Sequence, residues 1–442
     1  MSADRVLILC HAHPGLSLGG GEIAAYAQWQ ELRRQGVDAM FLARAAMPSG
    51  HAGTPFTARS ADGRDMLFHA PPVDHFRHSQ PARRVVYESF RELLESFRPT
   101  AVHFHHYVHL GLEMVREVRR YGAEIPVIMT LHDYLGICHA QGQMRKTSGM
   151  LCERATPLDC HCCFPERSPQ DFFLRELFVK SFFSLVDRFV CPSAFLRDRY
   201  AAWGLPAERL LVLENGHKRL PARAEEARPE AADGAAPDAP ARARFAVLGQ
   251  LSELKGTLVL LDAVRMLPKR LRETVRIELH GTMQHAPEAF RERVAQAHEE
   301  LQPALSYRGP YLPDSVDSIL RSVDWAIVPS IWWENSPLVI QEAFRAGRPV
   351  LCSDVGGMAE KVQDGVDGLH FRVGSAGDLA RCIERAATSA GLWEKLRGGI
   401  RQPPSIEDTV ARLLELYRGG RAAPAAARER RGAGAAGAAR QA

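Results

Sequence analysis

Short apolar runs alternate along this chain with longer segments in which apolar residues recur every three or four positions. In residues 83–98, for example, Val86, Phe90 and Phe97 lie on one face of a predicted helix that stops before Pro99. Strands that alternate with helices form βαβ units on a parallel sheet. The strands predicted for the first half of the chain are 5–10, 37–43, 101–105, 126–131, 188–192 and 211–216.

The alternation starts again after a break. Residues 217–244, above all from 221 onward, consist almost entirely of Ala, Pro, Arg, Glu, Asp and Gly. That composition has too few large apolar residues to build a core, so we interpret the segment as a flexible linker. The strands predicted beyond it are 245–248, 275–280, 306–308, 325–329 and 349–352.

Two successive halves of this kind predict an α/β fold with two Rossmann-like doubly wound domains, residues 1–216 and 245–418, that face an interdomain cleft. Ligands of such sheets bind beyond the carboxyl ends of the strands. The final residues, 419–442, are rich in Ala, Gly and Arg. We expect them to be disordered, with arginines suited to a weak contact with an anionic membrane.

Composition and charge narrow the class of protein. The chain has 442 residues, of which 46% are hydrophobic and 24% charged, and its formal net charge of +4 disfavours a nucleic-acid-binding protein. No apolar run approaches the ~18–20 residues that span a bilayer, and the first run, at 6–10, is shorter than the apolar core of a signal peptide. We therefore expect a cytoplasmic protein without a transmembrane segment, with at most a peripheral contact at the inner membrane face.

Two carboxylates, Glu334 and Glu342, lie on either side of a predicted helix start. Ser336 is a good N-cap and Pro337 a good first helical residue, which places Glu334 in the preceding loop and Glu342 about two turns into the helix. The alternative is a capped surface helix with two solvated acids.

The first backbone N–H groups of that helix, those of Leu338 and Val339, would have no intrahelical partner and would form an anion site together with the helix dipole. Carboxylates accept hydrogen bonds from sugar and ribose hydroxyls. The arrangement therefore indicates a diphosphate in the middle, with a sugar at each end.

A second candidate phosphate site directly follows the strand at 245–248. It begins with Gly249 and Gln250 and ends with Lys255 and Gly256. Glycine lets the backbone approach a phosphate, and lysine supplies a point charge. The order of residues is not that of a Walker A loop, and a solvated lysine in a loop is the alternative.

Two further motifs lie in the first half. Gly19 and Gly20 belong to a run of three glycines between the first strand and the first helix, which is either a binding loop or a flexible connector. His132 and Asp133 end the strand at 126–131, where active-site residues of such sheets collect. His132 would donate either to a sugar hydroxyl or to developing charge, although a lone histidine is more often structural.

Together these motifs resemble the family 4 retaining glycosyltransferases of GT-B fold, in family order over about residues 5–390. The matching elements are Gly19-Gly20, Thr130-Leu-His132-Asp133, Cys191-Pro-Ser193-Ala-Phe-Leu, Asn215-Gly216, Gly249 with Lys255-Gly256, Glu334 with Glu342, Gly347 with Pro349-Val350, and Gly356-Gly357 with Glu360. The resemblance implies an enzyme, a hexosyltransferase that moves sugar from a nucleotide-diphosphate donor to a glycan or lipid-linked acceptor with anomeric retention. It also implies a role in cell-surface polysaccharide biosynthesis.

The resemblance also implies roles for single residues. Lys255 would be the cation at the diphosphate, Glu342 the acid at the ribose, and Glu334 the acid at the donor-sugar hydroxyls, with His132 opposite. Gly19 and Gly20 would line the acceptor and phosphate side. No divalent cation would be required for catalysis. The chain departs from the family at Gln250, where an arginine is often found, so one cation is lost from the diphosphate site.

Two other functions use the same scaffold. One is a sugar-nucleotide epimerase or hydrolase, and the other is a non-catalytic partner protein that binds a nucleotide sugar. Release of nucleoside diphosphate that depends on an acceptor would distinguish the transferase from both.

The nine cysteines include one cluster, in a long loop at 136–168. Cys160 and Cys163 form a C-x-x-C pair, and Cys152 with either Cys138 or His139 would complete four ligands for a tetrahedral structural zinc ion. Free thiols and a disulfide are the alternatives. A zinc site here would pin a loop beside the acceptor cleft, so we expect it to be structural rather than catalytic.

Overall fold

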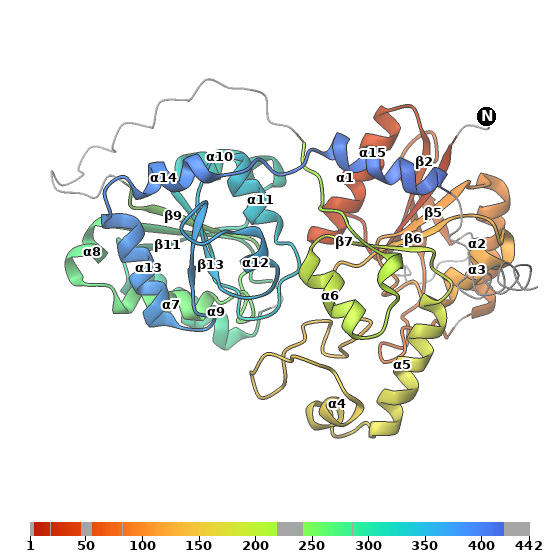
Figure 1. The fold of residues 1–442 in the computed structure, drawn as a ribbon, viewed down its shortest axis with the longest axis horizontal. Coiled ribbons are helices and arrows are strands. Elements are labelled where there is room, and N and C mark those ends of the chain that lie inside the picture. The colour runs from red at the N-terminus through yellow and green to blue at the C-terminus, as the bar shows by residue number, and fades with distance from the viewer. Residues whose placement is uncertain are drawn as a thin grey trace, which may run out of the picture.

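The computed structural model describes residues 4–17, 19–45, 55–81, 83–218, 242–284 and 286–419. It contains two parallel-sheet α/β domains that lie side by side (Figure 1). This confirms the predicted fold class. Most of the predicted linker at 217–244 and of the predicted tail at 419–442 lies outside the described residues. No helix in the described part of the chain has the length and apolar character needed to cross a membrane.

The first domain contains an eight-stranded sheet in the order β3-β4-β2-β1-β5-β6-β7-β8. All neighbouring strands are parallel except β3 and β4, which form an antiparallel edge. The strands are β1 (Arg5–Cys10), β2 (Asp38–Ala45), β3 (Phe56–Ala58), β4 (Asp65–His69), β5 (Ala101–Phe104), β6 (Val127–Thr130), β7 (Arg188–Cys191) and β8 (Leu210–Val212). The helices before the linker are α1 (Gly20–Arg34), α2 (Arg83–Phe97), α3 (Glu113–Tyr121), α4 (Pro157–Cys163), α5 (Pro169–Phe183) and α6 (Ala194–Ala202), followed by the 3₁₀ turn η1 (Ala207–Arg209).

The second domain contains a six-stranded parallel sheet in the order β11-β10-β9-β12-β13-β14. Its strands are β9 (Arg244–Leu248), β10 (Arg276–His280), β11 (Leu305–Gly309), β12 (Trp325–Val328), β13 (Val350–Ser353) and β14 (Gly368–Phe371). Its helices are α7 (Thr257–Met266), α8 (Lys269–Thr274), α9 (Glu288–Glu300), α10 (Val316–Ser322), α11 (Leu338–Arg345), α12 (Gly356–Lys361), α13 (Ala376–Thr388) and α14 (Leu392–Gly399), with the 3₁₀ turn η2 (Pro313–Ser315) before α10.

The last helix, α15 (Ile406–Arg418), corrects the predicted domain boundary. The sequence assigned residues 245–418 to the second domain, but α15 returns to the first and packs on α1 (Figure 1). Val410 and Leu413 are fully buried in the apolar layer beneath α1, and the hydroxyl of Tyr417 bonds His103 Nδ1 at 2.7 Å. The apolar stripe that makes 406–418 a helix therefore completes one face of the first sheet.

In each sheet the direction in which successive strands are added reverses at one point, and these two points indicate where a ligand site would lie. In the second sheet β9 lies beside β12, so the loops after these two strands leave the same edge on either side of a topological switch. In the first sheet the equivalent point lies between β1 and β5. A crevice forms at such a point beyond the carboxyl ends of the strands.

Candidate functional site

The loop after β9 is shaped by a close backbone approach. Gly256 has a φ of +71°, and a Cβ on it would lie 1.7 Å from the carbonyl oxygen of Pro329, which follows β12. Only glycine fits there, so the loop that ends in Lys255-Gly256 and the loop after β12 touch at the switch point. Gly249 also has positive φ, and a Cβ on it would meet nothing within 4 Å, which leaves this side of the loop open to a ligand.

The two charges that the sequence placed in separate loops meet directly. Lys255 Nζ donates to Glu334 Oε1 at 2.6 Å, and the same oxygen accepts from Ser330 Oγ at 2.7 Å and from Trp332 Nε1 at 3.0 Å. The Glu334 side chain is only 7% exposed, whereas that of Lys255 is 38% exposed. The buried carboxylate is therefore held by three donors, and the ammonium group remains within reach of a ligand.

Helix α11 begins one residue later than the sequence indicated. Pro337 is its N-cap, and no side chain caps the helix start. Ser336, predicted as the N-cap, instead accepts a hydrogen bond from Gln341 Nε2 at 3.3 Å. The leading N–H groups of Leu338 and Val339 consequently have no capping side chain, as an anion site requires.

The glycine run of the first domain faces this helix start. A Cβ on Gly20 would lie 3.5 Å from Leu338 Cδ1, which places the first turn of α1 opposite the first turn of α11. Gly19 is the N-cap of α1, and a Cβ there would collide with the carboxylate of Glu22, which also contacts His11 Nε2 at 3.3 Å. Gly20 therefore lies next to the second domain, and Gly19 leaves room for the Glu22 carboxylate of its own helix.

Glu342 lies in the second turn of α11, half-buried. Burial raises its pKa to about 7, although Arg345 acts in the opposite direction. Among the described residues no donor bonds or pairs with its carboxylate. Tyr311 lies close enough to be affected by Glu342: burial and the Glu342 carboxylate raise its pKa to about 12. An acid without a partner beside an anion site is suited to accept hydrogen bonds from ligand hydroxyls.

His132 lies on the opposite wall. A Cβ on Gly21 would lie 3.2 Å from its Cγ, and its Nε2 shares a hydrogen bond of 3.1 Å with Nδ1 of the buried His105. Burial, and after it the nearby His106 and His11, lowers the pKa of His132 to about 3. The ring is therefore neutral at physiological pH and acts as a hydrogen-bonding group rather than as a cation.

Asp133 has a structural role that fixes the end of β6. Nδ1 of His106 accepts the backbone N–H groups of Tyr107 and Val108, both at 3.0 Å, so its Nε2 carries the proton and donates to Asp133 Oδ2 at 3.1 Å. The other carboxylate oxygen accepts the Leu135 N–H at 2.7 Å. The strand end that presents His132 is thus held in place on both sides.

The structure brings Gly19, Gly20, Lys255, Glu334 and the start of α11 to one place between the domains, with His132 on the facing wall. The part played by each in binding or catalysis remains a prediction. Gln250 is exposed. Sequence reasoning missed Ser330 and Trp332, which hold Glu334, and also Tyr311, His105 and Asn335, because none of these belongs to a recognisable pattern.

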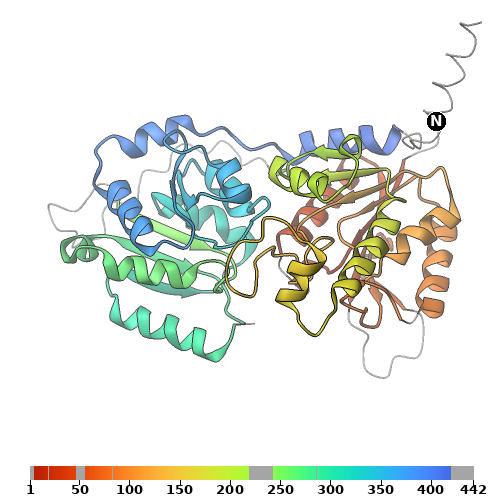
Figure 2. The same ribbon diagram turned by 60° about the horizontal axis from the view of Figure 1, so that its bottom comes forward.

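The cysteine loop of the first domain reaches the second domain. The indole Nε1 of Trp333 donates to the carbonyl of Cys152 at 3.2 Å, and Figure 2 shows this yellow segment lying against the other domain. Within the described ranges, no three or more His, Cys, Asp or Glu side chains are placed to hold a metal ion, and every cysteine is a free thiol. The structure shows no disulfide among these cysteines, and a structural zinc ion held by Cys138, Cys152, Cys160 and Cys163 stays a prediction.

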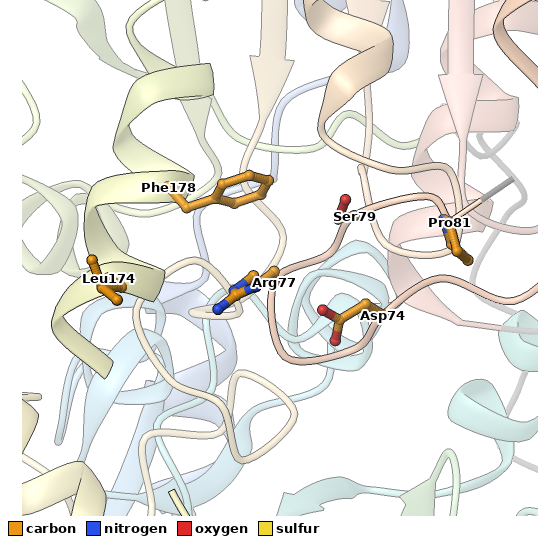
Figure 3. Close-up of a pocket in the computed structure, with 6 residues that line it drawn as sticks. All are labelled: Asp74, Arg77, Ser79, Pro81, Leu174 and Phe178. Carbon is orange, nitrogen blue, oxygen red and sulfur yellow. The ribbon is translucent and has the colours of Figure 1, made fainter. Parts of the chain in front are cut away.

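A cavity of about 440 Å³ opens elsewhere, on the first domain (Figure 3). None of its lining residues belongs to the candidate site. They are Asp74, Arg77, Ser79, Pro81, Leu174 and Phe178. The candidate site is therefore defined by converging loops at the switch points and not by this cavity.

Comparison with known proteins identifies two family models. Residues 242–389 match the model described as Glycosyl transferases group 1, and residues 19–216 match the model described as Glycosyl transferase 4-like domain. Lipopolysaccharide 1,2-N-acetylglucosaminetransferase of Salmonella typhimurium is 28% identical over 52% of this chain and 61% of its own. D-inositol 3-phosphate glycosyltransferase of Nocardia farcinica is 30% identical over 47% of each chain. Each match spans less than two thirds of the relative's length.

Two solved structures have the same fold. Anabaena Alr3699/HepE in complex with UDP and glucose superimposes with a TM-score of 0.62 at 15% identity, over 93% of this chain and 98% of that one. Sucrose-phosphate synthase of Thermosynechococcus elongatus gives a TM-score of 0.67 at 16% identity, over 94% and 98%. At such low sequence identity these neighbours show only that the chain shares their two-domain fold.

Proposed function

Because this chain belongs to the group 1 glycosyltransferases, we propose that it transfers a sugar from a nucleotide-diphosphate donor to a glycan or lipid-linked acceptor. The second domain would bind the donor and the first the acceptor. We further propose retention of the anomeric configuration and a role in cell-surface polysaccharide biosynthesis. The latter is supported by a relative that acts on lipopolysaccharide.

One observation carries this proposal: the half-exposed ammonium group of Lys255 lies in the same crevice as the uncapped start of α11. Departure of a nucleoside diphosphate is the difficult step in transfer from such a donor. A cation and oriented N–H groups stabilise the charge that develops on the leaving group. A ligand phosphate would share the ammonium group of Lys255 with Glu334. The Glu334 carboxylate would still accept hydrogen bonds from Ser330 and Trp332.

The facing wall supports the same assignment. His132 is neutral, so it would meet the sugar through a hydrogen bond and not through a charge. No carboxylate is assigned as a covalent nucleophile. We propose a same-face transfer in which the leaving phosphate helps to take the proton of the acceptor hydroxyl.

A thermal-shift screen against UDP-, GDP-, ADP- and dTDP-sugars tests donor binding. A UDP-sugar is the first choice, since the Anabaena neighbour was solved with UDP. We expect one nucleotide class to raise the melting temperature of the wild type. Lys255→Ala and Glu342→Ala should abolish that rise, and the exposed Lys269→Ala should keep it. If both site variants respond fully, the site is wrongly placed.

Turnover separates transfer from hydrolysis. Nucleoside diphosphate released only when an acceptor is added supports the transferase, and release at the same rate without acceptor would replace it by a hydrolase. Binding without release in the presence of a range of glycan and lipid-linked acceptors would favour the non-catalytic partner.

A further inference from the structure

Asn335 follows Glu334 directly and, like Trp333 before it, contacts the first domain. Its Nδ2 donates to the carbonyl of His132 at 3.2 Å and lies 3.4 Å from the carbonyl of Leu131. Its Oδ1 accepts the hydroxyl proton of Ser193 at 2.7 Å. The side chain is 8% exposed, so these bonds form away from bulk water.

The hydroxyl of Ser193 has its hydrogen bonds fixed on both sides. It is the N-cap of α6 and accepts the N–H of Leu196 at 3.1 Å, which leaves its own proton for Asn335. The two N–H groups before Leu196, those of Ala194 and Phe195, donate to the two carboxylate oxygens of Glu360 at 2.8 and 2.7 Å. The first turn of α6 is thus capped partly by its own serine and partly by an acid of the other domain.

The loop that carries Glu334 and Asn335 is also held by α12 of its own domain. The N–H of Gly357 donates to the carbonyl of Glu334 at 2.7 Å, and a Cβ on Gly357 would lie 1.5 Å from the carbonyl oxygen of Asn335. Gly357 lies at the start of α12 and Glu360 near its end. In Figure 1, α11 and α12 are on the side of the second domain that faces α6 and β7. The loop carrying Glu334 therefore lies between α12 and the first domain.

We propose that Asn335 is a positioning residue that couples closure of the two domains to the placement of Glu334 against His132. With Ser193 and Glu360 it forms an interdomain latch. The inference rests on the proposed function, since it concerns the two walls of that site. When the latch is open, Glu334 and His132 belong to separate bodies. When the latch is closed, the amide of Asn335, the residue next to Glu334, holds the backbone of His132. The two walls of the site are then fixed relative to each other, and such positioning lowers the activation barrier of the transfer.

Within the predicted site the latch residues contact only the backbone of His132, through Asn335, and the backbone of Glu334, to which Asn335 is joined. Removing the Asn335 side chain should therefore leave donor binding in place and slow the chemical step. We expect Asn335→Ala and Asn335→Asp each to lower kcat at least tenfold at saturating acceptor, with a donor KM within about twofold of wild type. Asn335→Asp keeps the size and the acceptor for Ser193, but it loses the amide donor and faces two carbonyl oxygens, so it tests the bond to His132 if the alanine variant fails to fold.

Ser193→Ala removes a helix cap as well as the latch bond, and Ser375→Ala is its matched control. Ser375 caps α13 in the same way, by accepting the N–H of Asp378 at 3.3 Å, within the second domain. Both serine variants should lose similar thermal stability, but only Ser193→Ala should lower kcat. In the double variant Asn335→Ala/Ser193→Ala the loss of kcat should be smaller than the product of the two single losses.

Three results of the assays with substrate would overturn the inference: an unchanged kcat in both Asn335 variants, loss of donor binding in parallel with kcat, or equal kcat in the two serine variants. Failure of the proposed function is distinguishable, since the wild type itself would then transfer no sugar. Small-angle X-ray scattering of the unliganded protein tests domain closure by the latch without any substrate, through the radius of gyration. Asn335→Ala should show a larger radius of gyration than wild type, and an unchanged radius would contradict the latch.

Discussion

Replacing Glu342 by glutamine should make the protein more heat-stable at alkaline pH and change little at pH 5. The carboxylate is half-buried, with no hydrogen-bond or ion-pair partner among the described residues, and burial raises its pKa from the ordinary 4.5 to about 7. An acid whose pKa is higher in the folded than in the unfolded state destabilises the folded state once the pH exceeds the unfolded value. The cost grows up to the folded pKa and is constant above it.

The shift sets the size of the effect. A rise to about 7 corresponds to at most about 3 kcal/mol at pH 8.5, and less than about 1 kcal/mol at pH 5, where the folded-state carboxyl is mostly protonated. Solvent reaches the half-exposed side chain and reduces this cost, so we expect Glu342→Gln to gain about 1–2 kcal/mol more at pH 8.5 than at pH 5. For a domain of this size that is a rise in melting temperature of roughly 2–8 °C.

Glu278 provides a control of opposite sign in the same domain. A hydrogen bond from His280, with a further one from Arg308, lowers the pKa of Glu278 to about 2 against the effect of burial. Glu278→Gln should therefore destabilise the protein, more at pH 8.5 than at pH 4, because stability from a depressed pKa is lost as the pH falls. Scanning calorimetry of both variants at these pH values is the assay. If Glu342→Gln has the same effect at pH 5 and pH 8.5, the carboxylate is not an unpaired buried acid.

Two further changes test the packing around the site and at α15. Gly357→Ala places a Cβ 1.5 Å from the carbonyl oxygen of Asn335 and should lower the free energy of unfolding by about 3 kcal/mol or more, seen as a drop in melting temperature. In the control, Gly398→Ala, the new Cβ meets no atom within 4 Å, so this variant should be neutral or stabilising. Equal melting temperatures of the two variants would refute the close approach at Gly357. Tyr417→Phe leaves Nδ1 of the buried His103 without its hydrogen-bond partner and should lower the free energy of unfolding by about 1–2 kcal/mol. It should also speed amide hydrogen exchange in α15, whereas the control Tyr121→Phe should not. Unchanged exchange in Tyr417→Phe would argue against the docking of α15.

Strands with both faces buried could be predicted to within one or two residues. Residues 325–329 were predicted and β12 is Trp325–Val328, with every residue buried, because a continuous apolar run between turn residues is a strong signal. β14 and α13 were missed. For α13 the signal exists: Ser375 caps it, and Leu379, Ile383 and Ala386 form a buried stripe. β3 and β4 lie in a stretch whose short polar-ended strands have no such pattern.

The sequence marked residues that the structure brings together between the domains, but it could not give their geometry. Lys255 and Glu334 are 79 positions apart, and their contact depends on the loops after β9 and β12 meeting at the switch point. The helix at 406–418 follows from its apolar spacing, but nothing in that spacing indicates which sheet it covers. Asn335 is an ordinary loop residue in the sequence, and its role depends on a carbonyl more than 200 positions away.

The return of α15 has a consequence for synthesis of the chain. Asp4 and Arg418 form an ion pair at 2.6 Å, so the first domain is built from segments on both sides of the second domain in the sequence, and the second domain is an insertion within it. The face of the first sheet that α15 covers stays open until residues 406–418 have left the ribosome. The nascent first half must therefore wait with an uncovered apolar layer while the inserted domain, whose segments are contiguous, is free to fold before it.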